Sequence, residues 1–257
     1  MTEKLSIPGG HGMLNALLRK PELAEGQKCP LVVLMHGFMA NLKLEPLKTI
    51  GAMLEQHGIA SLAFDFNGHG KSEGRFRDMN VFTELDDALM VYDYVRALPF
   101  VDKIAFCGHS QGGVVAGMTA AMLGDDENGN PKVTCIAQLA PAAVLHDDAL
   151  NGVLMGRHYD PKNPPEKLWV LFHWVGKCYF DCAQKIDIYG VSKDYRGPVC
   201  LVHGTDDSIV PHSYGEKYIE VYHDSELHLL EGENHFMSKR RQEVWDISVN
   251  FLVEHLS

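Results

Sequence analysis

Residues 108–112 read GHSQG, and this stretch decides the fold because it separates two apolar segments of different character. The residues before it, 103–107, form a strand-length apolar run, and the small residues after it, 112–118, suit a helix. A serine at the apex of a tight strand-to-helix turn needs glycine two positions before and after it, because larger side chains would clash. The turn presents the hydroxyl beside the amino terminus of the following helix, where negative charge is stabilised. The pattern therefore predicts that Ser110 is a nucleophile.

Bulk composition fits an ordinary globular enzyme. The chain has 257 residues, 46% hydrophobic and 22% charged, which is enough for one large α/β domain or two small ones. Its formal net charge of −11 would repel both nucleic acid and an anionic membrane. We therefore expect neither as a partner, and look instead for a small-molecule substrate.

The sequence shows no targeting or membrane-spanning pattern. No apolar stretch approaches the roughly 20 residues needed to cross a bilayer, and the first residues lack the charged-then-apolar pattern of a signal peptide. These features predict a cytoplasmic protein, or one from which a signal has been cut.

The cysteines are scattered, and Cys107, Cys135 and Cys200 lie in apolar strand-like runs, which favours buried free thiols. Cys178 and Cys182 are one helical turn apart, but no companion pair completes a zinc set, so we expect no metal. The six positions are Cys29, Cys107, Cys135, Cys178, Cys182 and Cys200.

Strand-length apolar runs alternate with helical segments along the chain. This alternation predicts a doubly wound, mostly parallel sheet, in which the ligand site lies beyond the carboxyl ends of the strands. The runs lie at 31–35, 61–66, 103–107, 133–139, 199–202 and 227–230, and the helical segments at 43–57, 83–98, 111–123, 212–222 and 239–255.

Two regions break the alternation. Residues 1–28, with a glycine-rich turn in the middle, predict an antiparallel hairpin at one sheet edge. Residues 142–197 are much longer than a plain connection and rich in tryptophan and tyrosine, so they should fold rather than form a disordered linker. We expect a core of residues 1–141 and 198–257, with 142–197 as an inserted cap over the serine.

A serine hydroxyl needs a base to take its proton, and the base needs an acid to orient it. His235 follows the last predicted strand and is therefore the expected base. His36 and His203 precede glycines at strand ends and should brace loops, while the ring of His109, which flanks the serine, should point elsewhere. For the acid, spacing alone leaves both Asp206 and Asp207 open.

Several motifs together resemble the α/β-hydrolase superfamily over nearly the whole chain. They are HGF at 36–38, DFNGHGKS at 65–72, GHSQGG at 108–113, the HG-x-x-D-x-x-VP pattern at 203–211, and His235. The resemblance implies that Asp207 is the acid, since it lies three residues after the glycine of that pattern. It also implies acyl transfer, in which the oxyanion needs two preorganised N–H donors, expected from Gln111 and Phe38.

Within that superfamily, the DFNGHG, GHSQGGVVA and LAPAA motifs and the short aromatic cap are similar to bacterial cinnamoyl (feruloyl) esterases. The likeness implies hydrolysis of hydroxycinnamate esters (ferulate, p-coumarate, caffeate and chlorogenate) without metal or organic cofactor, and allows a homodimer. It implies that Asp148 and Tyr179 bind the phenolic hydroxyl of the substrate, because a buried phenol needs polar partners. Met155 stands where relatives tend to carry glutamine, which removes one polar contact. We also expect Trp174 of the cap among the substrate-binding residues.

Other functions use the same residues. A general short-chain carboxylesterase or monoacylglycerol lipase would share Ser110, Asp207 and His235 beneath a cap shaped for alkyl chains, and a C–C bond hydrolase would also share them. A catalytically dead binding module is a further alternative, which reaction with a fluorophosphonate would distinguish.

Overall fold

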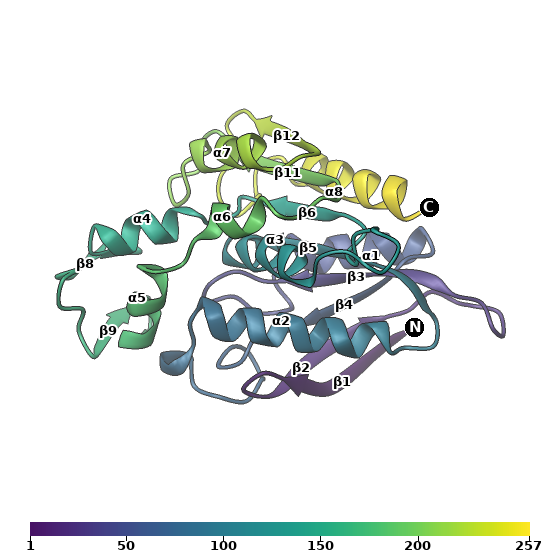
Figure 1. Ribbon diagram of the computed structural model, residues 1–257, viewed down its shortest axis with the longest axis horizontal. Helices are drawn as coiled ribbons and strands as arrows, with labels where there is room; N and C mark the ends of the chain where they lie inside the picture. The colour runs from purple at the N-terminus through teal and green to yellow at the C-terminus, as the bar shows by residue number, and fades with distance from the viewer.

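The computed structural model describes the whole chain, residues 1–257, and is built around one eight-stranded sheet. The strand order is β1-β2-β4-β3-β5-β6-β11-β12, which places strands distant in sequence side by side (Figure 1). The strands are β1 (Thr2–Gly9), β2 (Gly12–Arg19), β3 (Cys29–Met35), β4 (Ala60–Phe64), β5 (Val101–His109), β6 (Ile136–Leu139), β11 (Val199–Gly204) and β12 (Ser225–Leu230).

The sheet is parallel from β4 to β12, and the β1–β2 hairpin adds two antiparallel strands at one edge. The expected edge hairpin and the doubly wound sheet are therefore both present. Because the parallel strands share one direction, all their carboxyl ends meet at the same edge, where the glycine- and histidine-bearing turns gather.

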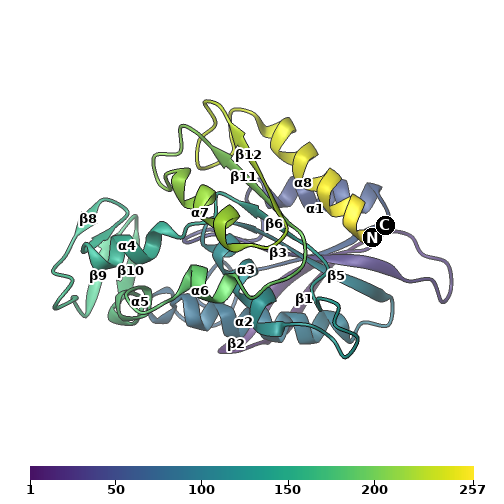
Figure 2. The same cartoon turned by 45° about the horizontal axis from the view of Figure 1, so that its top comes forward.

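Helices cover both faces of the sheet (Figure 2). On one face, α1 and α8 pack against a buried cluster that includes Val32, Leu34 and Val202. On the other, α2, α3, α6 and α7 pack against a larger cluster around Phe64 and Phe106. The bounds are α1 (Leu47–Gln56), α2 (Val81–Arg96), α3 (Gln111–Leu123), α6 (Ile188–Ser192), α7 (Ser213–Val221) and α8 (Arg241–Leu256), with a short 3-10 turn η1 at Phe76–Asp78. None of these helices combines the length and apolar character needed to cross a bilayer.

The segment 142–197 is folded and projects beyond one end of the sheet, toward the left in Figure 1. Its buried side chains, among them Leu145, Tyr179 and Phe180, belong to the same apolar cluster as the α2–α3 face of the core. Besides α6, it contains α4 (Val144–Leu150), β7 (Val153–Leu154), β8 (Arg157–His158), β9 (Lys167–Val170), β10 (His173–Gly176) and α5 (Lys177–Ala183), with β7–β8 and β9–β10 forming two small hairpins.

Element boundaries differ from the sequence expectation where pairing or proline decides them. β5 runs two residues past Cys107, because Gly108 and His109 still pair with Gln138 and Leu139 of β6. Helix α1 begins only at Leu47, directly after Pro46, although the predicted helix started at residue 43. The extension of β5 matters for function because it carries the chain directly to Ser110.

Candidate active site

Ser110 occupies the turn between β5 and α3 in a strained conformation, with φ 57° and ψ −125°. Its backbone N–H donates to the carbonyl of Leu139, at 2.8 Å, which ties the turn to the neighbouring strand. A Cβ on Gly112 would collide with the carbonyl oxygens of Met35 and His36, and one on Gly37 would lie 2.8 Å from the Cβ of Ser110. The glycines are therefore required by close packing around the serine.

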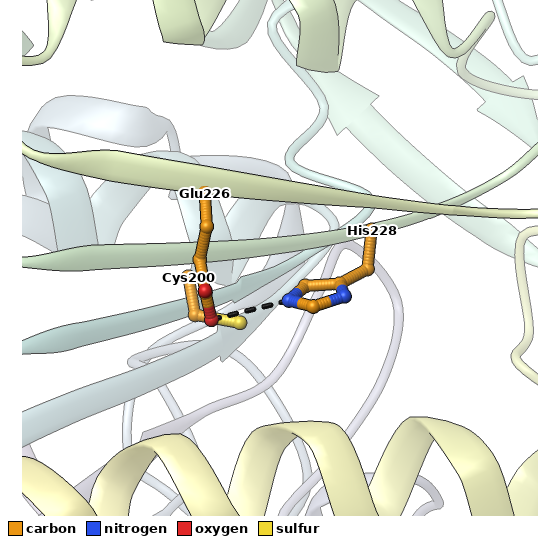
Figure 3. A group of neighbouring side chains, drawn as sticks. All are labelled: Cys200, Glu226 and His228. Carbon is orange, nitrogen blue, oxygen red and sulfur yellow. Dashed lines mark ion pairs between the residues drawn. The ribbon is translucent and has the colours of Figure 1, made fainter.

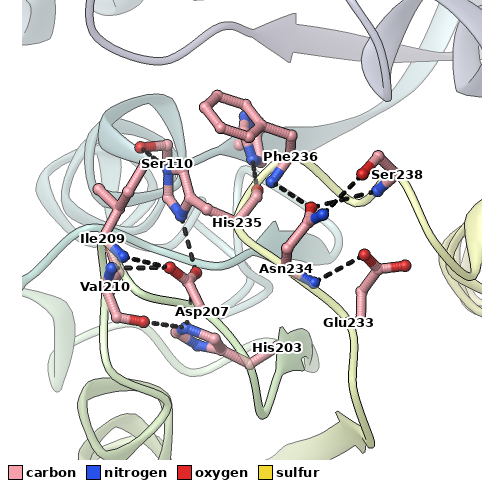
Figure 4. Close-up of polar contacts among 11 residues, drawn as sticks. Ser110, His203, Asp207, Ile209, Val210, Glu233, Asn234, His235, Phe236 and Ser238 are labelled. Carbon is pink, nitrogen blue, oxygen red and sulfur yellow. Dashed lines mark hydrogen bonds and ion pairs between the residues drawn. The ribbon is translucent and has the colours of Figure 1, made fainter.

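The structure brings the three expected side chains together (Figure 4). Nε2 of His235 lies 2.9 Å from Oγ of Ser110, and Nδ1 of the same ring lies 2.7 Å from Oδ2 of Asp207. All three residues are buried, although they come from three separate turns at the carboxyl edge of the sheet. A hydroxyl, an imidazole and a carboxylate in this order form a proton-transfer chain.

Asp207 is held as an anion by its surroundings. Its Oδ1 accepts from the backbone N–H groups of Ile209 and Val210, at 2.9 and 2.8 Å, while its Oδ2 faces the two imidazoles of His235 and His203. Burial opposes the charge, but the hydrogen bonds from His203 and His235 outweigh it and hold the pKa of Asp207 below its usual value. Asp206, by contrast, is exposed and pairs with Lys239. Geometry therefore separates the two aspartates that spacing left open.

The other three histidines near the site brace loops or the base, as expected for His36 and His203. Nε2 of His36 accepts from the backbone N–H of Phe66, and Nε2 of His203 bonds to the carbonyl of Val210. The ring of His109 turns away from the serine hydroxyl and bonds through Nε2 to the carbonyl of His235, at 2.7 Å. Burial lowers the pKa of His36 to about 4 and that of His109 to about 3, so neither ring is charged at neutral pH.

Two backbone N–H groups are available beside the serine hydroxyl. Gln111 is the first residue of α3, so its N–H has no acceptor within the helix. The N–H of Phe38, in the turn after β3, has no acceptor among the loop and side-chain hydrogen bonds of the structure. Gly37, directly before Phe38, packs against Ser110. Both N–H groups therefore belong to residues that line the same hollow as Ser110, and neither has an acceptor within the protein.

Two hollows meet at Ser110. The first encloses about 510 Å³ including its open mouth and lies under the inserted segment; 13 of its 16 lining residues are hydrophobic. The second, of about 740 Å³, lies over the His235 side and includes Leu44 and Phe236. Phe38, Ser110, Met155 and Ile209 line both. A substrate with two dissimilar halves could therefore place one half on each side of the serine.

Three of the four cap residues expected at the substrate line the first hollow, namely Asp148, Tyr179 and Met155. Burial, with a smaller contribution from Asp147, raises the pKa of Asp148. The hydroxyl of Tyr179 donates to Oε1 of Gln111, at 2.8 Å.

The expectation for Trp174 is wrong as to its position, because this residue lines neither hollow. In the β9–β10 hairpin, Val170 and Val175 face inward and are fully buried, so the alternating positions point outward. Trp174 therefore pairs with Trp169 across the exposed face, with ring centroids 5.1 Å apart, and Nζ of Lys167 lies over its ring.

Sequence reasoning missed Glu84 of α2, which lies directly behind the site. Its Oε2 accepts from Nε2 of Gln111, at 2.8 Å, and the residue is 1% exposed. A signal was present, since Glu84 continues a helical stripe whose later members, Ala88, Val91 and Val95, are all buried. An acid in an apolar stripe calls for a specific partner.

Potential metal ligands lie away from the nucleophile. Sγ of Cys178 donates to the carbonyls of Arg77 and Met79, so this cysteine braces η1. Cys200, Glu226 and His228 place one ligand atom each within 4.8 Å of one another, on the face of β11 and β12 that α8 covers (Figure 3). Nε2 of His228 already faces Oε1 of Glu226, at 3.1 Å, so an ion pair accounts for the grouping. Cys200 and Glu226 are each the second residue of their strand, whereas Ser110 follows the carboxyl end of β5.

Comparison with known proteins agrees with this arrangement. Residues 26–162 match the family described as serine aminopeptidase S33. Two solved structures of Est1E from Butyrivibrio proteoclasticus are similar along 98% of both chains: one with ferulic acid bound is 31% identical with a TM-score of 0.90, and the other is 28% identical with a TM-score of 0.86.

Curated relatives are more distant. Protein ABHD12B from Homo sapiens is 27% identical over 75% of this chain, and lysophosphatidylserine lipase ABHD12 from Danio rerio is 22% identical over 75%. The chain spans about half the length of these relatives, 49% and 47%. Because the family match covers more than half of the chain and the likeness to Est1E nearly all of it, this protein belongs to the serine aminopeptidase S33 family and is an α/β-hydrolase serine esterase resembling feruloyl esterases.

Proposed function

We propose that this protein hydrolyses esters of hydroxycinnamic acids, with Ser110 as nucleophile, His235 as general base and Asp207 as the acid that orients the base. The observation that carries the proposal is the hollow under the inserted segment, where Asp148 and Tyr179 stand among apolar side chains on the path to Ser110. An aromatic acyl group suits such a lining, and its phenolic hydroxyl needs the polar partners.

The reaction runs through an acyl-enzyme. His235 takes the proton of Ser110 as its Oγ bonds to the ester carbonyl carbon, and the resulting oxyanion accepts from the N–H groups of Gln111 and Phe38. Collapse breaks the bond to the alcohol oxygen, which leaves with the proton from His235. Water then attacks the acyl-serine with His235 again as base, and the carboxylic acid leaves. The chain's own groups supply every proton transfer.

The two hollows divide the substrate. The hydroxycinnamoyl group would lie in the first hollow, against Tyr159 and Phe180, and the alcohol would lie in the second, beside Leu44 and Phe236. The second hollow is larger and also has Glu45 in its lining, so the proposal allows a polar alcohol.

Similarity supports the aromatic acyl group. Est1E, whose solved structure holds ferulic acid, matches this chain over 98% of its length, which includes most of the inserted segment. The curated relative named as a lysophosphatidylserine lipase makes a lipid ester the alternative substrate, although that likeness covers only part of the chain.

A rate comparison tests the proposal. We expect kcat/KM for methyl ferulate, methyl caffeate and chlorogenate to exceed that for p-nitrophenyl butyrate corrected for its better leaving group, and to exceed that for a monoacylglycerol. Methyl 3,4-dimethoxycinnamate is the matched control for methyl ferulate, because it keeps the ring and its 3-methoxy group and removes only the phenolic proton. Faster cleavage of the monoacylglycerol than of every hydroxycinnamate would replace the proposed substrate class with a lipid ester.

A further inference from the structure

Three buried polar side chains form a continuous chain behind the nucleophile. Nε2 of Gln111 donates to Oε2 of Glu84, and Oε1 of Gln111 accepts from the hydroxyl of Tyr179, each at 2.8 Å. Glu84, Gln111 and Tyr179 are 1%, 2% and 3% exposed and come from α2, α3 and α5, respectively. The chain therefore links a core helix, the residue after Ser110 and the inserted segment.

No cation faces the carboxyl group of Glu84. The titratable groups around it are Asp87 on its own helix and Tyr179 and Cys182 on α5, and its neighbour from α3 is the uncharged Gln111. Its Oε1 is buried without any hydrogen-bond partner, and no ion pair of the structure includes the residue. An ionised carboxylate would be poorly stabilised in such surroundings.

Burial raises the pKa of Glu84 to about 8; the hydrogen bond from Gln111 opposes this effect and Asp87 adds to it. The three titratable neighbours of Glu84 have pKa values on either side of this value. The pKa of Tyr179 lies well above 10 and that of Cys182 is about 11, while that of Asp87 is about 6. Only Glu84 among them changes charge in mildly alkaline solution.

We propose that Glu84 is a positioning residue that must remain uncharged, holding Gln111 and, through it, Tyr179 in the geometry for acyl transfer. The inference rests on the proposed function, in which the backbone N–H of Gln111 donates to the oxyanion and Tyr179 lines the first hollow, where the acyl group would lie. Loss of the Glu84 proton adds a negative charge behind the residue that stabilises the oxyanion. In a buried, poorly screened site this charge raises the energy of the transition state.

The test is the pH dependence of kcat/KM from pH 6.5 to 9.5, corrected for alkaline hydrolysis, with methyl ferulate and with p-nitrophenyl butyrate. Wild-type activity should fall at least fivefold above a midpoint near pH 8. Glu84→Gln keeps the shape and the acceptor oxygen but cannot ionise, so its activity relative to its own value at pH 7 should stay flat. Asp86→Asn removes an exposed carboxylate two positions away on the same helix and should keep the wild-type profile.

Glu84→Leu removes the acceptor for Gln111 and should lower kcat for both esters at pH 7 at least tenfold, with a smaller change in KM. A wild-type profile without an alkaline fall, or a fall that Glu84→Gln retains, would overturn the proposal. If Glu84→Gln does not fold, infrared spectra of the wild type test the proposal instead. The band of a protonated carboxyl must then disappear with the same pH midpoint as the activity.

Failure of the substrate assignment is distinguishable from failure of this inference. If hydroxycinnamates are poor substrates, the profile with p-nitrophenyl butyrate still reports on Glu84. If no ester is cleaved, the rate at which a fluorophosphonate labels Ser110 replaces turnover, and its unchanged value from pH 7 to 9.5 would count against Glu84.

Discussion

Two buried acids flank the same turn, and their surroundings shift their pKa values in opposite directions. Asp207, on one side of Ser110, receives two backbone N–H groups and faces two imidazoles, and its pKa lies below the usual value. Glu84, on the other side, receives one amide N–H and has no cation nearby, and burial raises its pKa to about 8. Burial is common to both acids, so the number of donors decides which of them is charged.

This contrast has a chemical meaning. In the proposed reaction the anion stands beside the base, where it would stabilise the imidazolium that forms as Ser110 loses its proton. The uncharged acid stands behind Gln111, where the proposed oxyanion develops and a second negative charge would be harmful. Negative charge is therefore kept on the side of the turn where positive charge appears during the reaction.

The largest expected effect comes from removing the hydroxyl of Ser110, which lies between the two acids. Ser110→Ala deletes the nucleophile and should lower kcat by about 10⁵-fold or more, leaving the modest residual rate that binding and the oxyanion donors provide. Turnover of methyl ferulate and labelling by a fluorophosphonate measure it. Retention of even one hundredth of wild-type turnover would show that another group attacks the ester.

The next largest effect is expected from Asp207, the charged acid. Asp207→Asn should lower kcat by about 10⁴-fold, because an amide cannot stabilise the charged His235 or hold its required tautomer. Asp206→Asn is the matched control, since that side chain is exposed and paired with Lys239, and it should stay within about twofold of wild type. Equal losses in the two variants would mean that the acid assignment is incorrect.

The sequence could predict the charged side because its residues lie in turns at strand ends. Ser110, His235 and the Asp206–Asp207 pair each follow an apolar strand, and parallel strands bring those ends together. The choice between the aspartates required the resemblance or the geometry, because both stand in the same turn. The uncharged side was missed because a glutamate in a helix is ordinarily solvent-exposed. Trp174 was misplaced because composition does not reveal which face of a hairpin a side chain occupies.

A smaller effect, selective for phenolic esters, tests the two polar residues of the first hollow. Asp148→Asn and Tyr179→Phe should each lower kcat/KM for methyl ferulate roughly 10-fold, or about 1.4 kcal/mol, since each weakens a hydrogen bond to a buried phenol. The rate for methyl 3,4-dimethoxycinnamate should change much less with Asp148→Asn. Asp147→Asn is the control on the same helix, because Asp147 accepts from Tyr214 and does not line that hollow. Equal losses on both esters would mean that Asp148 does not bind the phenolic hydroxyl.

The last comparison separates the two acids by stability rather than rate. Glu84 keeps its proton in the folded protein up to a pKa of about 8, whereas the unfolded chain releases it near the ordinary value of 4.5. Between these values the unfolded state binds fewer protons, so the free energy of unfolding falls as pH rises, by at most about 1.4 kcal/mol per pH unit, and levels off above pH 8.

Thermal unfolding from pH 6.5 to 9 measures this loss. Asp87 titrates at about 6 and Asp207 below its ordinary value, so neither contributes much in that window. The buried histidines, whose pKa burial lowers, and the buried cysteines, whose pKa burial raises, also change the free energy of unfolding there. The contribution of Glu84 is therefore the difference between the wild-type and Glu84→Gln curves. We expect Tm to fall by several degrees more for the wild type than for Glu84→Gln, because about 1 kcal/mol corresponds to roughly 2–4 °C for a chain of this size. Asp86→Asn should show the same fall as the wild type. Parallel curves for wild type and Glu84→Gln would mean that Glu84 is already ionised in the folded protein, and the contrast between the two acids would then lose its electrostatic basis.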